Sequence, residues 1–182
     1  GEERLAVWDP SLFGGFIPRG EVRAAVDFLA GEFDIVRAYI DPAGSAMGAV
    51  DGAIDDNDDS WRTELAEWSA KYGSSKGSQV SKWVAWSCAR ITPMHASLEQ
   101  FRSAIRNPES LWRHDGDKIT RTHVGNAVMV AKTGGRYVLG KPHGADHLKI
   151  DQAMSSDLAH EAAMDAMKDG DFEVAPDHYV YF

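Results

Sequence analysis

The chain has 182 residues and a formal net charge of −9, a size that one domain with its own hydrophobic core can fill. Its 28 acidic against 19 basic residues argue against a basic nucleic-acid groove that covers the surface, but not against an enzyme that meets DNA at an acidic, metal-loaded pocket. No apolar run reaches the roughly 20 residues of a membrane helix, and the first residues lack the apolar core of a signal peptide. The single cysteine, Cys88, excludes an internal disulfide. These features predict a soluble protein of a reducing, intracellular compartment.

The chain opens with a predicted strand, a helix and a second strand. Residues 4–9 are a short apolar run, and residues 20–33 carry apolar side chains on one helical face, with Gly31 near the predicted end of the helix. Residues 34–41 are dense in β-branched and aromatic side chains, which predicts a buried central strand that Pro42 ends.

The middle of the chain predicts an acidic insertion followed by a helix and a strand. Residues 50–60 hold five acids and few apolar residues, and we expect a solvated loop there. Ser60 is placed to cap a helix over residues 61–73, and residues 79–89 alternate well enough to form a strand.

The second half of the chain is mostly helical by its apolar spacing. The predicted elements are helices over residues 93–107, 118–131 and 147–166, an apolar stretch at 136–140, and a tail from about 170 to 182 that forms a last strand or lies across the surface. In "HDGD" (114–117), Asp115 and Gly116 predict a turn and Asp117 a helix cap. We find no repeat and no clear second domain, so residues 1–182 are expected to form one domain.

Strands that alternate with helices predict the α/β class, with a mixed or parallel sheet flanked by helices. In such sheets reacting groups gather outside the carboxyl ends of strands, which is where Asp41 falls. Asp151 lies beside the apolar stripe of the last helix, where burying a lone carboxylate would be costly. Two such carboxylates can share Mg²⁺ or Mn²⁺, ions that suit phosphodiester hydrolysis. The plainer alternative is that Asp41 belongs to a turn and that Asp151 is solvated.

Three stretches occur in a series that resembles the nuclease domain of the large terminase subunits of tailed phages: "FDIVRAYIDPAG", "HDGDKITRTHVGNAV" and "KIDQAMSSDLAHEA". The resemblance covers about residues 5–166 and implies a ribonuclease-H-like fold. It assigns Asp41 and Asp151 as catalytic metal ligands of a suspected two-metal site that holds Mg²⁺ or Mn²⁺. His123 and Asn126 match further positions and share one helix face, from which they would brace the metal site or contact DNA. The alternative is that both side chains satisfy nearby backbone groups.

The resemblance implies an endonuclease that cuts concatemeric double-stranded DNA during genome packaging, in the cytoplasm of an infected bacterial host. The implied partners are double-stranded DNA, the small terminase subunit and the portal, with no membrane. The family's first catalytic aspartate lies on an opening strand that has no counterpart here, since Asp9 falls on the wrong strand, and no ATPase phosphate loop is present. We therefore expect a metal site that is incomplete in this chain. The rival interpretations are a catalytically incomplete interaction or regulatory domain and another nuclease or recombinase of the same superfamily.

Other metal motifs are weaker. His143 and His147 have a spacing that can bind zinc, but the intervening glycine predicts a loop and a plain surface pair. The acidic run at 55–59 lacks the glycine and distal glutamate of a calcium loop.

Overall fold

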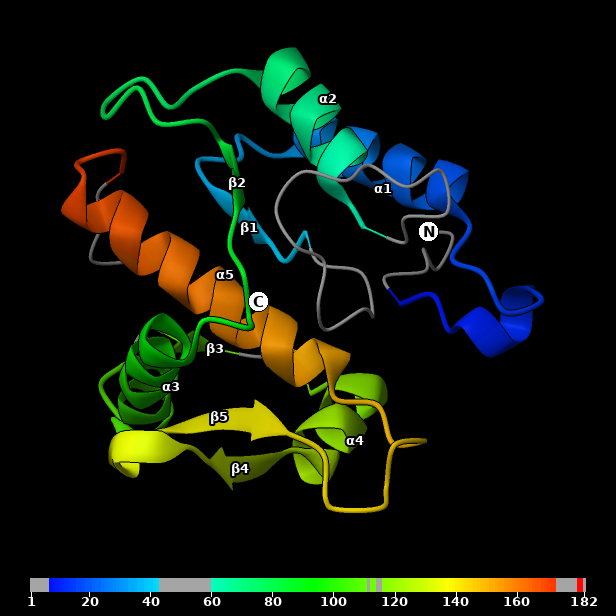
Figure 1. Ribbon diagram of the computed structural model, residues 1–182. Helices are drawn as coiled ribbons and strands as arrows, with labels where there is room; N and C mark the ends of the chain where they lie inside the picture. Colours follow the sequence, from blue (N-terminus) through cyan, green and yellow to red (C-terminus); the bar gives the residue numbers. More distant parts are fainter. Residues whose placement is uncertain (1–6, 43–59, 111, 114–115, 173–179, 182) are drawn as a thin grey trace. The chain divides into compact units, whose positions relative to one another are not determined.

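The structure is a computed structural model that describes residues 7–42, 60–110, 112–113, 116–172 and 180–181 (Figure 1). Most of the predicted acidic insertion, the start of the predicted opening strand, Asp115 and most of the tail lie outside these residues. Contacts divide the chain into two compact units, Gly1–Ile35 and Val36–Phe182. The predicted α/β class is confirmed, and the expectation of one nuclease domain stays a prediction.

The first unit contains a 3₁₀ turn, η1 (Pro10–Phe13), and helix α1 (Arg19–Glu32). Residues 7–9 have no regular structure, so the predicted opening strand is wrong in its described part. Asp9 instead caps η1, because its side chain accepts a hydrogen bond from the amide of Ser11 (3.0 Å). Helix α1 is as predicted, but Gly31 lies within it and the helix ends at an extended Phe33.

The described strands of the second unit form three separate pairs instead of the single sheet that we predicted. They are β1 (Ala38–Ile40) with β2 (Trp83–Ala85), parallel; β3 (Trp112–Arg113) with β6 (Val180–Tyr181), parallel; and β4 (Val128–Ala131) with β5 (Tyr137–Gly140), antiparallel. Strand β1 is half-buried and shorter than the predicted central strand. At Gly140 a Cβ would come within 2.6 Å of Val130 Cγ2, so this pair of strands needs glycine there.

The helices of this unit are α2 (Arg62–Tyr72), α3 (Ile91–Arg106), α4 (Lys118–Asn126) and α5 (Asp151–Lys168), with a short turn, η2 (Thr133–Gly135). Helix α2 has Trp61 at its N-cap position, one residue after the predicted cap Ser60, and the side chain of Trp61 makes no capping hydrogen bond. Asp117 does cap α4, accepting from the amides of Ile119 (2.7 Å) and Thr120 (2.9 Å). The helix predicted to reach residue 131 ends at Asn126, because the β-branched residues that follow enter β4.

The core of the second unit lies where α3 and α5 meet the strands. Trp86, Met94, Leu98 and Leu158 form one buried cluster, and half-buried side chains of β1 and β5 pack against it. Helix α5 contacts α3, α4 and β1, which makes it the central element of this unit (Figure 1). Most of the apolar faces predicted for α2, α3 and α5 are buried, but Ile105, on the predicted face of α3, is exposed. Among the described residues no helix is both long and apolar enough to span a membrane.

Candidate functional site

Asp41 follows β1 directly and is half-buried. Its neighbour from the next strand is Cys88, which lies beyond the end of β2 and belongs to the rim of the core. The pKa of the Cys88 thiol is raised, first by burial, then by the charge of Asp41 and a hydrogen bond with it, and last by the charge of Asp157. Asp41 is therefore close to the parallel partner of its own strand, as its position at the carboxyl end of β1 requires.

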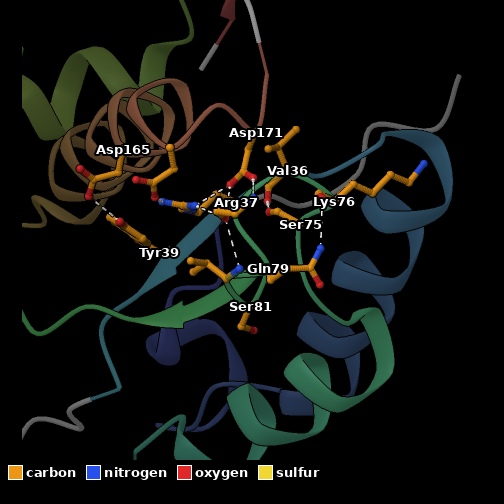
Figure 2. Close-up of polar contacts among 12 residues, drawn as sticks. Val36, Arg37, Tyr39, Ser75, Lys76, Gln79, Ser81, Asp165 and Asp171 are labelled. Carbon is orange, nitrogen blue, oxygen red and sulfur yellow. Dashed lines mark hydrogen bonds and ion pairs between the residues drawn. The ribbon is translucent and has the colours of Figure 1, made fainter.

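Helix α5 runs antiparallel to β1, and paired side chains record this alignment (Figure 2). Before β1, the guanidinium of Arg37 donates to Asp169 (2.8 Å) and Asp171 (2.6 Å), just beyond the end of α5. Two residues later, the hydroxyl of Tyr39 donates to Asp165 (2.6 Å), one turn earlier in α5. Because the chain runs forward in β1 while it runs backward in α5, the carboxyl end of β1 points toward the amino end of that helix.

Asp151 is the first residue of α5 and is exposed. The helix was predicted to start at residue 147, with Asp151 one turn in, and that boundary is wrong. A carboxylate at this position is favoured by the unsatisfied amides of the first helical turn. No described hydrogen bond or ion pair joins Asp151 to Asp41, so the shared metal site stays a prediction.

His123 and Asn126 both reach the start of α5 from α4. Nδ1 of the buried His123 accepts a hydrogen bond from the amide of Gln152 (3.1 Å), and Nδ2 of Asn126 donates to the carbonyl of Lys149 (2.9 Å). Ile150, the N-cap residue of α5, provides no capping side chain, so His123 supplies the missing acceptor from another helix. Both residues thus satisfy nearby backbone groups, as the plainer interpretation held, and they fix the segment that carries Asp151.

Sequence reasoning missed a buried acid, Asp157, on the inner face of α5. Its side chain is 0% exposed, and no hydrogen bond from a described residue reaches either carboxylate oxygen. Burial raises the pKa of Asp157 to about 7; the nearby Ser97 hydroxyl opposes this shift, although it does not reach the geometry of a hydrogen bond, and the charge of Glu161 adds to it. The available signal was spacing, because Asp157 falls three residues after Met154 and beside Leu158, within the apolar stripe.

Sequence reasoning also missed the contacts of Arg37. Asp171 receives a hydrogen bond from the Ser78 amide (2.6 Å) as well as from Arg37, and these bonds lower the pKa of its carboxyl, the Ser78 amide most strongly. The side chains of Arg37 and Asp171 are 3% and 0% exposed. This buried pair belongs to the framework of the second unit, since it joins the start of β1 to the end of α5.

Within the described ranges no three or more histidine, cysteine, aspartate or glutamate side chains cluster as metal ligands. Mg²⁺ does not need such a cluster, because it keeps several waters and binds through one or two carboxylates together with substrate phosphates. His143 and His147 lie exposed in a loop, as the surface-pair interpretation predicted.

Comparison of the chain with protein-family models, with curated proteins and with solved structures finds no match.

Proposed function

We propose that this chain is a ribonuclease-H-like nuclease domain of the terminase type, which uses Asp41 and Asp151 to hold Mg²⁺ or Mn²⁺ and cuts double-stranded DNA. The observation that carries the proposal is the antiparallel alignment of β1 and α5. The contacts of Arg37 and Tyr39 fix that alignment, so that the strand end bearing Asp41 points toward the helix end bearing Asp151. Asp151 lies 14 residues before Asp165, about 21 Å along α5, whereas Asp41 lies two residues, about 7 Å, beyond Tyr39, so the two carboxylates are roughly 14 Å apart along the helix axis.

The two carboxylates differ in exposure, and we assign them different roles in the proposed metal site. Asp41 is half-buried beside Cys88, whereas Asp151 is exposed and open to solvent. His123 and Asn126 hold the backbone on either side of Ile150, so that the position of Asp151 is fixed without a ligand.

When bound, the cation would activate a water and stabilise the leaving oxygen of the phosphodiester. The residues of the chain contribute by binding that ion and by fixing its position against the strand end. Contacts to DNA would go mainly to phosphates, so the cut would show little base readout, and partners such as the small terminase subunit and the portal would decide where it falls.

The test is Mn²⁺ binding, followed by electron paramagnetic resonance, together with plasmid cleavage in Mn²⁺. Asp41→Asn and Asp151→Asn keep side-chain size but remove a charged ligand, so each should weaken Mn²⁺ binding at least tenfold and abolish nicking. Asp146→Asn, at an exposed loop carboxyl outside the proposed site, is the matched control and should behave as the wild type. Equal binding and cleavage by all four proteins would refute the assignment.

A second candidate is an interaction domain that keeps the fold without catalysis. It is favoured by the net charge of −9, with 28 acidic against 19 basic residues, which suits a protein partner better than a DNA duplex. The same measurement separates the two functions, because this candidate predicts neither Mn²⁺ binding nor cleavage by the wild type.

A further inference from the structure

An apolar groove lies between helices α3 and α4. It has a volume of about 460 Å³, and strands β4 and β5 and the first turns of α5 also contribute to its lining. The apolar side chains that line it include Leu98, Phe101, Ile105, Val124, Met129 and Leu139. Neither Asp41 nor Asp151 lines it, so this feature is separate from the proposed metal site.

The groove is open, and its apolar lining reaches the surface of the second unit. Ile105, Val124 and Met129 are 51%, 54% and 59% exposed. They come from three different elements and line one hollow, whereas exposed apolar residues on a soluble surface are ordinarily scattered. A contiguous apolar surface of this kind is typical of an interaction site.

Three arginines stand around this apolar lining: Arg102 and Arg106 from α3, and Arg121 from α4. Arg102 faces Glu99 at 3.5 Å, whereas no described hydrogen bond or ion pair involves the side chain of Arg106 or Arg121. The one acid in the lining, Asp117, already accepts hydrogen bonds from two amides of α4. The rim is therefore locally positive on a chain whose net charge is −9.

We propose that this groove docks a short amphipathic segment of a partner protein, whose apolar side chains are flanked by carboxylates. The face of α3 between Leu98 and Arg106 is about 12 Å long at 1.5 Å per residue, or roughly two helical turns. A groove of that length takes apolar anchors at positions i, i+3 or i+4, and i+7 of a docked helix. Carboxylates beside these anchors meet guanidinium groups that can bind them with two parallel hydrogen bonds.

The lining argues against DNA as the occupant, because the surface between the arginines is mainly apolar and its few hydroxyl groups, those of Thr120, Tyr137 and Ser156, are too few for the phosphate and base contacts of a DNA site. It also argues against a small anionic amphiphile. Such a ligand is normally enclosed over most of its surface, whereas Ile105, Val124 and Met129 in this groove stay about half exposed.

The experiment is selection of a displayed library of random 16-residue peptides on the full chain, followed by fluorescence anisotropy with the most enriched peptide. The enriched peptides should carry at least three apolar residues at helical spacing with Asp or Glu beside them. Met129→Ser and the double variant Arg106→Glu/Arg121→Glu should each weaken binding at least tenfold.

Two substitutions of the same kinds serve as controls outside the groove. Met164→Ser lies on α5 at a side chain that is 41% exposed, and Arg62→Glu lies at the exposed start of α2. Both should bind the peptide as the wild type does, and circular dichroism should show all variants folded.

Several results would overturn the proposal. They are a library without enriched peptides, enriched peptides that are basic or lack the apolar spacing, and equal binding by groove and control variants. Displacement of the peptide by a 20-base-pair duplex or by dodecanoate, at lower concentration than the unlabelled peptide needs, would assign the groove to DNA or to a small amphiphile instead. None of these outcomes bears on Mn²⁺ binding at Asp41 and Asp151.

Discussion

Cys88 offers a direct probe of the carboxylate that follows β1, because it is the only cysteine in the chain. Burial and the nearby charge of Asp41 both raise the pKa of its thiol, and the thiolate is the reactive form. Asp41→Asn removes the charge while leaving the burial, so the pKa should fall and alkylation by iodoacetamide at pH 8.5 should become faster. Asp146→Asn should leave the rate unchanged, and an unchanged rate in Asp41→Asn would show that the two side chains are not neighbours.

Asp157 should make the folded state less stable as pH rises. Its pKa is about 7 in the folded chain and near 3.9 when unfolded, so between these values the folded state binds more protons and the free energy of unfolding falls with increasing pH. From pH 5 to pH 8 this group should cost on the order of 2–3 kcal/mol. Asp157→Asn cannot ionise, so in urea titrations it should lose that part of the pH dependence.

The exposed carboxyl of Asp146 supplies the control for this measurement, because Asp146→Asn should keep the pH dependence of the wild type. The account of Asp157 would be wrong if Asp157→Asn lost as much stability as the wild type over the same pH interval.

At the scale of elements, the start of α5 depends on a side chain from α4. His123→Ala leaves the Gln152 amide without its acceptor, which should lower the free energy of unfolding by about 1–2 kcal/mol. His147→Ala, an exposed histidine in the loop before α5, should cost nothing measurable. Urea denaturation of the two variants checks this role. Equal free energies of unfolding for His123→Ala and His147→Ala would show that His123 does not cap α5.

The elements also show what the sequence could and could not predict. Helices α1, α2, α3 and α5 follow from apolar spacing, and the cap at Asp117 follows from local hydrogen bonding. The junction of α4 and β4 was missed because Val128 and Val130 belong to a short apolar run whose spacing fits a helix as well as a strand. The start of α5 was misplaced because its cap comes from His123, 29 residues away in the chain, and no local pattern records such a contact.

At the scale of the whole molecule, strand pairing was the least predictable feature. The strands of the second unit are only two to four residues long, too short for their side chains to specify one register or one sheet. The contacts of Arg37 with Asp169 and Asp171 span 132 and 134 residues and depend on tertiary structure that spacing does not encode. Asp41 was chosen from sequence as the residue that ends a strand, which is a local feature, whereas Asp151 was chosen from its place beside an apolar stripe and from the resemblance, and its position at the first residue of α5 was not foreseen.

The central claim is that the carboxylates of Asp41 and Asp151 bind one divalent cation at a shared site. The most direct measurement is a crystal structure of the full chain grown with MnCl₂, with an anomalous difference map collected at the manganese edge. The account predicts a peak whose ion lies within about 2.5 Å of a carboxylate oxygen of each residue. A map without a peak there, or an ion held by other side chains while these two carboxylates face apart, would contradict it.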